Sequence, residues 1–500
     1  MDAFRLGSSR GLTPVMAAVV FWGFLAAASG HAQVASQSIR EEVLAAMAKA
    51  TGFMMDKVAD KGGFLWHYSS DLSRKWGEIP ARDSQIWVQP PSTPTVGAML
   101  VDAYKATGDK RYREYAGKTA DVLIWGQGAS GGWHYFIDFD PAGVREWNAE
   151  APNNFRGWEE FYHYYGNATF DDDTTTSAIR FLLRLYNTTL DAKYRPAVLL
   201  GIEFVLEAQY KNGAWPQRFP LKPEYSHDGR PDYSVHYTFN DGVAANNIYL
   251  LWEAYETLGD ERYLTAARTG MDFYFAAQLP EPQAGWAQQY SFDLKPAWGR
   301  SYEPSALCTA QTLDNIRDLQ EFYRLTGDRR FLRPIPAALD WLQRSVIPSL
   351  APRATHAFYY EVGSNAPLYP HHVVKDGKID HYVVNHEPSF MQAHSATMKI
   401  DVEKLRQQYE VLASQSPEEI KASRPTEHGR PSPETPSREE VSKLIQSLDS
   451  RGAWLSDIEV IDTGNYVDNP PFRFRGIDTR TYVRNMYRCL AFLSAEGESK

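Results

Sequence analysis

The stretch "YETLGDERY" at residues 255–263 belongs to a short phrase that recurs along the 500-residue chain. The copies are "YKATGDKRY" (104–112), "YNTTLDAKY" (186–194), "YETLGDERY" (255–263) and "YRLTGDRRF" (323–331). In three copies a glycine can end one helix in the left-handed conformation, and the aspartate after it can cap the next helix. We therefore interpret Asp109, Asp260 and Asp328 as structural caps between paired helices.

A second phrase, built on glycine and tryptophan, follows the turns. Its clearest copies are "GGWHY" (131–135), "GAWPQR" (213–218) and "GWAQQY" (285–290). Helix pairs that recur roughly every 70 residues, each followed by a long loop, predict an all-α fold, namely an α/α toroid of helical hairpins. The tryptophan loops would then gather at one end of the ring, around a cleft. In the C-terminal third, an Asp-Gly turn at 376–377 between strand-like segments predicts minor β-hairpin elements.

The N-terminus has the pattern of an export signal. Arg5 and Arg10 precede the apolar run "VMAAVVFWGFLAAA", and small residues follow near Ala32. This predicts a secretory signal peptide over 1–32 and a secreted or periplasmic protein; the alternative is an uncleaved anchor. Beyond it we expect a helical segment over 33–109, a main domain over 110–413, a disordered loop or insertion over 414–440, and a C-terminal helical closure over 441–500. Whether Cys308 and Cys489 pair is left open.

The overall charge limits the ligands to be considered. The net charge is −10, which argues against a nucleic-acid partner because such a partner needs a basic surface. An anionic ligand remains compatible with this charge, since a local arginine or a bound cation can reverse the field inside one groove.

Three adjacent aspartates in "FDDDTTT" raise a separate question, because neighbouring carboxylates repel one another. Asp173 can cap a helix that begins at Thr174, whereas Asp171 and Asp172 need solvent, an arginine or a cation. Asp241 begins another helix, and Arg300 and Glu303 lie in the loop before a further one. By the repeat these loops are equivalent and would surround one cleft. Carboxylate oxygens from two loops suit Ca²⁺, although solvated helix caps explain the same aspartates.

The order of these motifs resembles a known family. "GQGASGGWHYFIDFD", "FDDDTTTSAIRFLLRLY", "AQYKNGAWPQRFPLKPEYS", "YTFNDG" and "GWAQQYSFDLKPAWGRSYEPSAL" are similar to the successive motifs of the pectate lyases of polysaccharide lyase family 10. The resemblance covers about residues 110–345. The chain departs from the family pattern at the triple aspartate, where Asp-Asn or a similar pair is usual. Residues 40–105 also have no counterpart in the family.

The resemblance implies a helical toroid that cleaves polygalacturonate, or a related uronan, by anti β-elimination. It implies a calcium site at Asp171, Asp172 and Asp241, and Arg300 as the Brønsted base. It also suggests a set of substrate-binding residues: Trp133, Trp215, Lys222, Asn240, Trp286, Glu303 and Arg406. We expect a monomer that acts on an acidic polysaccharide and contacts no membrane after signal cleavage.

The implied chemistry is coherent. Removal of the proton at C5, next to a carboxylate, builds negative charge that a cation can stabilise. Because the pKa of a free arginine exceeds about 12, an arginine base predicts activity at high pH. Two other functions remain open: a toroidal hydrolase of acidic oligosaccharides that uses opposed carboxylates such as Asp171–Asp173 and Glu303, and a glycan-binding protein without catalysis.

Overall fold

The computed structural model describes residues 39–140, 142–154, 159–222, 226–227, 230–376, 378–389, 396–422, 435–460 and 472–498. The expected signal peptide at 1–32 lies outside these residues. Within them, no helix combines the length and the apolar character needed to cross a bilayer.

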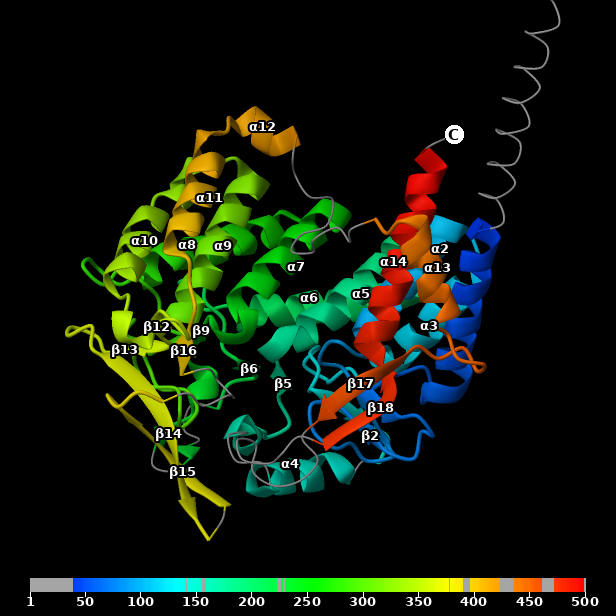
Figure 1. The fold of residues 1–500 in the computed structure, drawn as a ribbon, viewed down its shortest axis with the longest axis horizontal. Helices are drawn as coiled ribbons and strands as arrows, with labels where there is room; N and C mark the ends of the chain where they lie inside the picture. The colour runs from blue at the N-terminus through cyan, green and yellow to red at the C-terminus, as the bar shows by residue number, and fades with distance from the viewer. Residues whose placement is uncertain are drawn as a thin grey trace, which may run out of the picture.

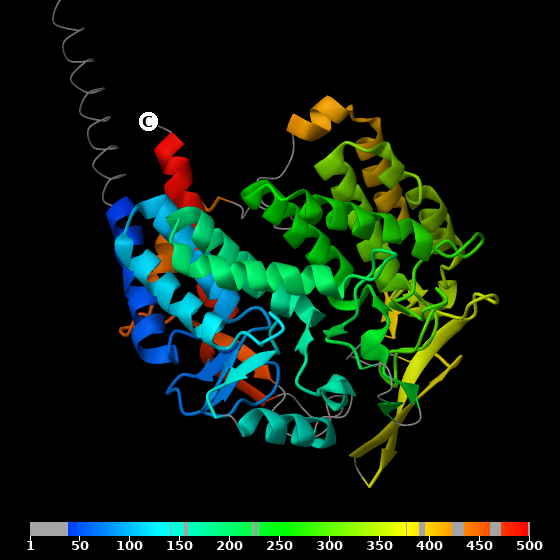
Figure 2. The ribbon, with the colours of Figure 1, turned by 180° about the vertical axis from the view of Figure 1, so that it is seen from behind.

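Paired helices recur along the described chain, as predicted. The pairs are α2 (Thr93–Thr107) with α3 (Lys110–Trp125), α5 (Thr174–Thr189) with α6 (Arg195–Ala208), α7 (Val243–Leu258) with α8 (Glu261–Ala277), and α9 (Thr309–Thr326) with α10 (Ile335–Arg344). The other helices are one over 39–53, α4 (Gly143–Asn154), α11 (Val402–Ser414), α12 (Pro417–Ala422), α13 (Arg438–Gln446) and α14 (Thr479–Glu498). Figures 1 and 2 show the pairs following one another along an arc.

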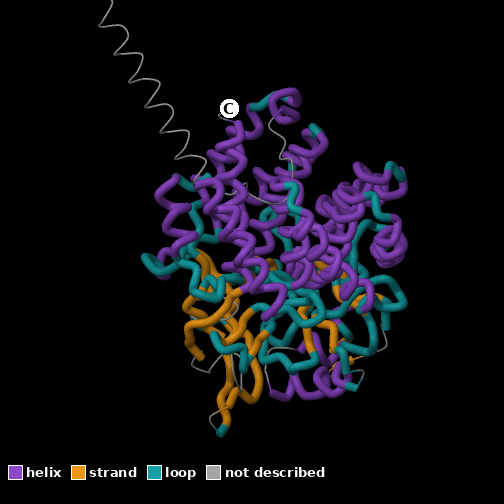
Figure 3. Tube along the Cα trace, turned by 90° about the vertical axis from the view of Figure 1, so that its right-hand side faces the viewer, coloured by secondary structure: helices purple, strands orange, loops and turns teal. Residues whose placement is uncertain are grey.

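Short strands and long loops gather at one end of the helices, as Figure 3 shows. One antiparallel sheet has the order β17-β18-β1-β2, and another has the order β11-β13-β14-β15. Their strands are β1 (His67–Ser69), β2 (Lys75–Trp76), β17 (Leu455–Val460) and β18 (Phe472–Asp478), then β11 (Leu307–Cys308), β13 (Tyr359–Tyr360), β14 (Pro367–Lys375) and β15 (Lys378–Asn385).

Five two-stranded ribbons join loops at the same end of the molecule. They are β3 (Gln85–Trp87) with β4 (Phe136–Asp138), β5 (Ala168–Thr169) with β6 (Arg218–Phe219), β7 (Ser226–His227) with β8 (Arg230–Pro231), β9 (Tyr237–Thr238) with β10 (Gln289–Tyr290), and β12 (His356–Ala357) with β16 (Thr397–Met398). The ribbons β3–β4, β5–β6 and β9–β10 each link the loops on the two sides of a helix pair, so each of these loops is positioned by its neighbour. The ribbon β7–β8 lies within a single loop.

The two ends of the described chain pack together. Strand β1 pairs with β18 in antiparallel register, with His67 opposite Asp478. The Tyr482 hydroxyl donates to Thr51 Oγ1 over 2.9 Å. The C-terminal helix α14 is thereby fixed against the N-terminal segment. Cys489 on α14 and Cys308 at the start of α9 are both buried free thiols.

The segment predicted to be a disordered loop, 414–440, is partly helical. It contains α12 and the first residues of α13, whose N-cap is a reciprocal capping box between Ser437 and Glu440. Residues 423–434 within it lie outside the described part of the chain.

The repeated turns are built as the sequence predicts. Asp109, Asp260 and Asp328 each accept a hydrogen bond from the backbone N–H two residues later. In the copy without glycine, Leu190 occupies the left-handed position with φ of 54°. Its side chain is 74% exposed, so little packing offsets the unfavourable backbone conformation.

Replacement of Leu190 by glycine should therefore stabilise the fold by about 1 kcal/mol, once the flexibility of glycine in the unfolded chain is subtracted. Leu190→Ala is the matched control, because it removes the same exposed side chain but keeps the Cβ atom that opposes positive φ. Thermal unfolding of the three proteins measures the difference. Equal melting temperatures for the glycine and alanine variants would contradict the prediction.

The tryptophans of the repeated loops are core residues, so their predicted role in lining the cleft is wrong. Trp133, Trp215 and Trp286 are buried to 1% exposure or less. Each indole N–H donates to a carbonyl of the preceding helix, at 2.8, 2.9 and 2.9 Å. Each ring therefore fixes a loop to its own helix pair.

A half-buried carboxyl joins three consecutive helices. Asp318 on α9 accepts from the Tyr274 hydroxyl over 2.8 Å and from the Tyr249 hydroxyl over 3.4 Å. Burial raises the pKa of Asp318 to about 7. Because the folded protein holds this proton more tightly than the unfolded chain does, stability falls as the pH rises from about 4 towards 7, by up to about 1.4 kcal/mol per pH unit.

Asp318→Asn should remove this slope, since the amide keeps a hydrogen-bond acceptor for a tyrosine without the charge. Denaturant unfolding at pH 5 and pH 8 measures the effect. We expect the variant to match the parent protein at pH 5 and to exceed it at pH 8. A parallel pH dependence in both proteins would contradict the assignment.

Candidate active site

Two short turns with the same backbone geometry face each other at the starts of α5 and α7. The first is Asp171–Asp173 and the second is Asn240–Gly242, and the two turns are in contact. The middle residues, Asp172 and Asp241, have φ of 49° and 53°, and the following residues are also left-handed. Such conformations cost on the order of 1–3 kcal/mol for a non-glycine residue, and they persist where the surroundings enforce them. The turns therefore place Asp172 and Asp241 in equivalent positions.

Asp173 occupies the N-cap position of α5, but not as a conventional cap. Its side chain accepts no hydrogen bond from the helix backbone. It accepts instead from the Thr176 hydroxyl, and it lies 3.9 Å from Nη1 of Arg180. The left-handed backbone of Asp173 prevents the usual capping geometry, so the predicted cap is correct in position only.

Arg300 lies at the centre of a group of carboxylates from three separate loops. It is 7% exposed. Its Nε donates to Glu160 over 2.9 Å and its Nη1 donates to Glu303 over 3.1 Å. Asp171 lies 3.6 Å from Nη2, and Asp241 lies 3.9 Å from Nη1. The structure thus brings together Asp171, Asp241, Arg300 and Glu303, as the sequence predicts.

The Arg-x-x-Glu spacing explains how Arg300 and Glu303 meet. The Arg300 N–H donates to Oε2 of Glu303, and the Glu303 N–H donates to the Arg300 carbonyl over 2.8 Å. This local turn folds the carboxylate back onto the guanidinium of its own loop. Glu303 therefore holds Arg300 in place.

Glu159 and Glu160 are site residues that the sequence analysis missed. They lie in a single 3₁₀ turn, Glu159–His163, outside the repeated phrases. Glu160 binds Arg300, and Glu159 accepts from the Ser301 N–H over 2.5 Å and from the Ser301 hydroxyl. In the sequence, only the adjacent glutamates at the start of "EEFYHYY" could have indicated this part of the site.

A line of uncharged side chains fixes Asp241 from behind. The Tyr359 hydroxyl donates to Gln288 over 2.8 Å, Gln288 donates to Asn240 over 2.7 Å, and Asn240 donates to Asp241 over 2.7 Å. On the other side, the Tyr135 hydroxyl donates to Asp171 over 2.5 Å. Asn240 was predicted as a substrate contact, and here it positions a carboxylate.

The shifted pKa values of Arg300 and Asp241 indicate that negative charge exceeds positive charge around Arg300. Burial opposes the charge of Arg300, but its carboxylate neighbours, Glu160 foremost, raise its pKa well above the usual value. Burial and then the charges of Asp171 and Asp172 raise the pKa of Asp241. Burial favours the neutral form of Asp171, yet Arg300 and several hydrogen bonds outweigh it and lower the pKa.

Asp172 differs from its neighbours in its surroundings. The residue is exposed at the surface, but protein atoms crowd its carboxyl group from the inner side. This partial desolvation, followed by the charge of Asp171, raises its pKa to about 7. Near neutral pH the site therefore holds a carboxyl that can give up its proton to bind a cation.

The donor set fits calcium chemically. Asp171, Asp172 and Asp241 supply hard oxygen atoms, which Ca²⁺ prefers. Oδ1 of Asp171 is buried and has no hydrogen-bond partner among the described residues. Across those same residues, however, no three His, Cys, Asp or Glu side chains converge closely enough to hold an ion as they stand. The Arg300 guanidinium lies between the aspartates, so a cation requires these side chains to turn.

Two predicted substrate contacts lie elsewhere. Arg406 on α11 donates to Asp340 of α10 over 2.6 Å, so it joins two helices. Lys222 lies over the Tyr165 ring, 5.4 Å from its centre. Two other arginines near the C-terminus, Arg473 and Arg475, pair with Glu459 and Asp457 within the β17–β18 ribbon. None of these contacts reaches the carboxylates around Arg300.

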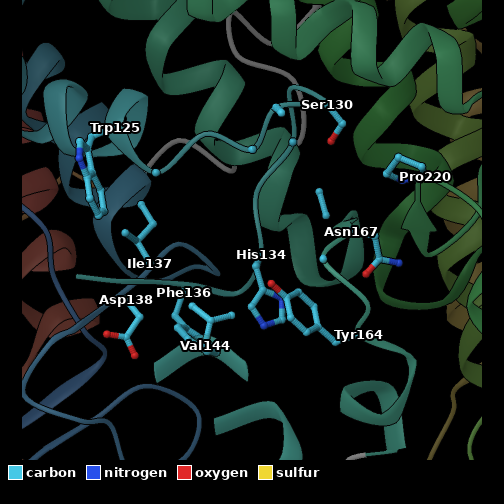
Figure 4. A pocket seen from close by; sticks show the side chains of 16 residues that line it. Trp125, Ser130, His134, Phe136, Ile137, Asp138, Val144, Tyr164, Asn167 and Pro220 are labelled. Atoms are coloured by element: carbon cyan, nitrogen blue, oxygen red, sulfur yellow. The ribbon is translucent and has the colours of Figure 1, made fainter. Parts of the chain in front are cut away.

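Figure 4 shows a pocket of about 480 Å³ whose lining includes residues of the segment 128–138, in the loop after α3. His134 and Tyr164, stacked 4.4 Å apart, line it together with Asn167. Neither ring nitrogen of His134 and neither amide atom of Asn167 has a hydrogen-bond partner within the described chain. The next residue after His134 is Tyr135, which binds Asp171, so the pocket and the centre share one loop.

Arg218 lies behind this loop and is fully buried. Its guanidinium is 5.2 Å from the centre of the Tyr135 ring. Its three side-chain nitrogens have no hydrogen-bond partner in the part of the chain that the structure describes. A buried guanidinium whose neighbours are aromatic rings and whose N–H groups lack acceptors is unusual, and it favours an anionic partner.

Comparison with known proteins supports the resemblance found in the sequence. Residues 145–357 match the family described as pectic acid lyase. A comparison with curated proteins finds no match. The matched residues include Glu160, the two aspartate turns and the Arg300 loop.

Solved structures give more distant likenesses. A mutant of a family 10 polysaccharide lyase from Cellvibrio cellulosa, in complex with trigalacturonic acid, is 21% identical, with 55% of this chain and 86% of that chain covered and a TM-score of 0.36. A cellobiose 2-epimerase from Spirochaeta thermophila is 11% identical, with coverages of 92% and 98% and a TM-score of 0.46. An α-mannanase from Bacteroides thetaiotaomicron is 10% identical, with coverages of 93% and 97% and a TM-score of 0.41.

Proposed function

We propose, starting from the match of residues 145–357 to pectic acid lyases, that the protein is an exported, calcium-dependent lyase. Its substrate would be polygalacturonate or a related uronan, cleaved by anti β-elimination. The observation that carries the proposal is the set of four carboxylates around one buried arginine, all within the matched residues. The same proposal includes the closure of the helices into a toroid, a catalytic domain over residues 110–413, a monomeric state and secretion.

The charge balance of the site supports a cation requirement. Glu160, Asp171, Asp241 and Glu303 surround Arg300, so the centre is negative overall. A polyuronate is itself an anion and would be repelled at such a centre. A divalent cation held by Asp171, Asp172 and Asp241 would reverse this field. When bound there, calcium would neutralise a uronate carboxylate and make the neighbouring C5–H more acidic.

Arg300 is the proposed Brønsted base. It would accept the proton from C5 while the electron pair forms the C4–C5 double bond. The bond from C4 to the glycosidic oxygen breaks, and the leaving oxygen takes a proton from water. In the structure its carboxylate partners hold it protonated. Neutralisation of Asp171 and Asp241 weakens that hold, and high pH favours the same change. Glu160 and Glu303 keep the guanidinium in place throughout.

The neighbouring pocket and Arg218 suit the rest of the polymer. His134 and Asn167 offer unpartnered polar atoms, and the Tyr164 ring offers a flat face for a sugar. The Arg218 guanidinium, buried 6.0 Å from the centre of the Tyr164 ring, would add positive charge near the pocket and so favour a second uronate. We therefore place a sugar next to the cleavage site in this pocket.

A single assay tests the proposed function. The protein is incubated with polygalacturonate, with and without EGTA, and the absorbance of a 4,5-unsaturated product is followed together with new reducing ends. Calcium-dependent absorbance is the expected result. Reducing ends without absorbance would indicate a hydrolase instead, and binding without either product would indicate a non-catalytic glycan-binding protein.

A further inference from the structure

A segment of the chain that lies outside the matched residues 145–357 reaches the acidic centre. Nε2 of Gln89 donates to Oδ2 of Asp172 over 2.7 Å and to Oε2 of Glu78 over 2.9 Å. One amide nitrogen thus holds two carboxyl groups from parts of the sequence far apart. The resemblance in sequence offers no counterpart for this N-terminal segment.

Gln89 is built into the structure from every side. It is 1% exposed, and its side-chain oxygen accepts from the Trp87 indole over 2.9 Å. Its backbone carbonyl accepts from the Trp66 indole over 2.9 Å and from the Ser92 hydroxyl over 2.7 Å. An amide fixed in this way cannot turn away from Glu78 and Asp172. The position of Glu78 beside Asp172 is therefore set by the fold.

Glu78 has negative neighbours. The charges that act on it come from Asp172, Glu160 and Asp171. Carboxylates at such a place repel one another unless a proton or a cation lies between them. A second and independent feature is Oδ1 of Asp171, which is buried and has no hydrogen-bond partner among the described residues. Both features point to a missing positive ligand.

We propose that Glu78 is a further carboxylate of the cation site and that Gln89 is the residue that positions it. This inference rests on the proposed function, because it assumes a divalent cation at Asp171, Asp172 and Asp241. Glu78 would raise the number of carboxylates to four, within the six to eight oxygen ligands that Ca²⁺ takes. Asp172 then joins the N-terminal segment to the site through Gln89.

Calcium binding to the full chain, measured by calorimetry with calcium alone, tests the inference. Glu78→Gln should weaken calcium binding about 10–100-fold, and Gln89→Met should weaken it in the same direction. Asp83→Asn is the matched control, since Asp83 is an exposed carboxylate of the same segment, paired with Lys75. Its affinity for calcium should equal that of the parent protein.

Thermal unfolding separates this role from a structural one. Without calcium, Glu78→Gln should melt at the parent temperature or above it, because the change removes a repelled charge. The rise in melting temperature on calcium addition should be smaller than in the parent. A lower calcium-free melting temperature with an unchanged calcium affinity would overturn the inference and leave the proposed function standing. A parent protein that binds no calcium would overturn both.

Discussion

Replacement of Arg300 by lysine should reduce the formation of unsaturated product from polygalacturonate by at least about 100-fold, since loss of a positioned base costs about 10²–10⁴ in rate. Lysine keeps the positive charge, but it lacks the planar fork that binds Glu160 and Glu303 at the same time. The reacting nitrogen would then no longer be held in place. The measurement is kcat for the absorbing product at saturating calcium.

Lysine is preferred to alanine because the buried carboxylates around position 300 need a positively charged side chain between them. Removing the guanidinium would leave Glu160 and Glu303 buried and unpaired, at a cost of about 3–5 kcal/mol. Arg262→Lys is the matched control, because Arg262 also binds two carboxylates, Glu203 and Asp260, but on the exposed start of α8. If Arg300→Lys is folded and retains the parent kcat, Arg300 is not the base.

The sequence was sufficient to predict the parts of the fold that depend on local rules. The helix pairs, the left-handed glycines and the caps Asp109, Asp260 and Asp328 follow from backbone preferences within nine-residue phrases. The same logic placed Asp171, Asp241 and Arg300 in equivalent loops, and the structure brings them together.

The rest depends on packing between distant segments. The tryptophans look alike whether they face a cleft or the core, and only the fold shows that Trp133, Trp215 and Trp286 point inward. Glu160 and Glu78 carry no repeat signal, because they lie on loops that the repeating helices merely bring close to Arg300 and Asp172. Arg406 was chosen for its charge, and its actual partner is another helix.

The two aspartate turns are also related in sequence. "FDDD" at 170–173 and "FNDG" at 239–242 share an aromatic residue followed by a three-residue turn whose middle residue is aspartate. The structure gives Asp172 and Asp241 nearly the same φ, and it places the two turns in contact. Asn240 occupies the position of Asp171, so one turn supplies two candidate ligands and the other supplies one ligand with an amide to hold it.

Substitution of Asp241 by asparagine should have opposite effects on stability with and without calcium. Burial and the charges of Asp171 and Asp172 already disfavour the charged form of Asp241. Its contact with Arg300 is long, at 3.9 Å, and contributes little in return. In EGTA the variant should therefore melt at the parent temperature or above it, because a repelled charge is removed. With calcium, the ligand-induced rise in melting temperature should be nearly absent.

Activity should fall because calcium binding is weakened. We expect Asp241→Asn to lose at least about 100-fold in calcium affinity, and to recover part of the parent activity only at high calcium concentration. Asp293→Asn is the matched control, since Asp293 is an exposed loop carboxylate paired with Lys295. The experiment follows melting temperature and product formation against calcium concentration for all three proteins. A variant that is destabilised in EGTA yet gains as much from calcium as the parent would show that Asp241 supports the fold and does not bind the ion.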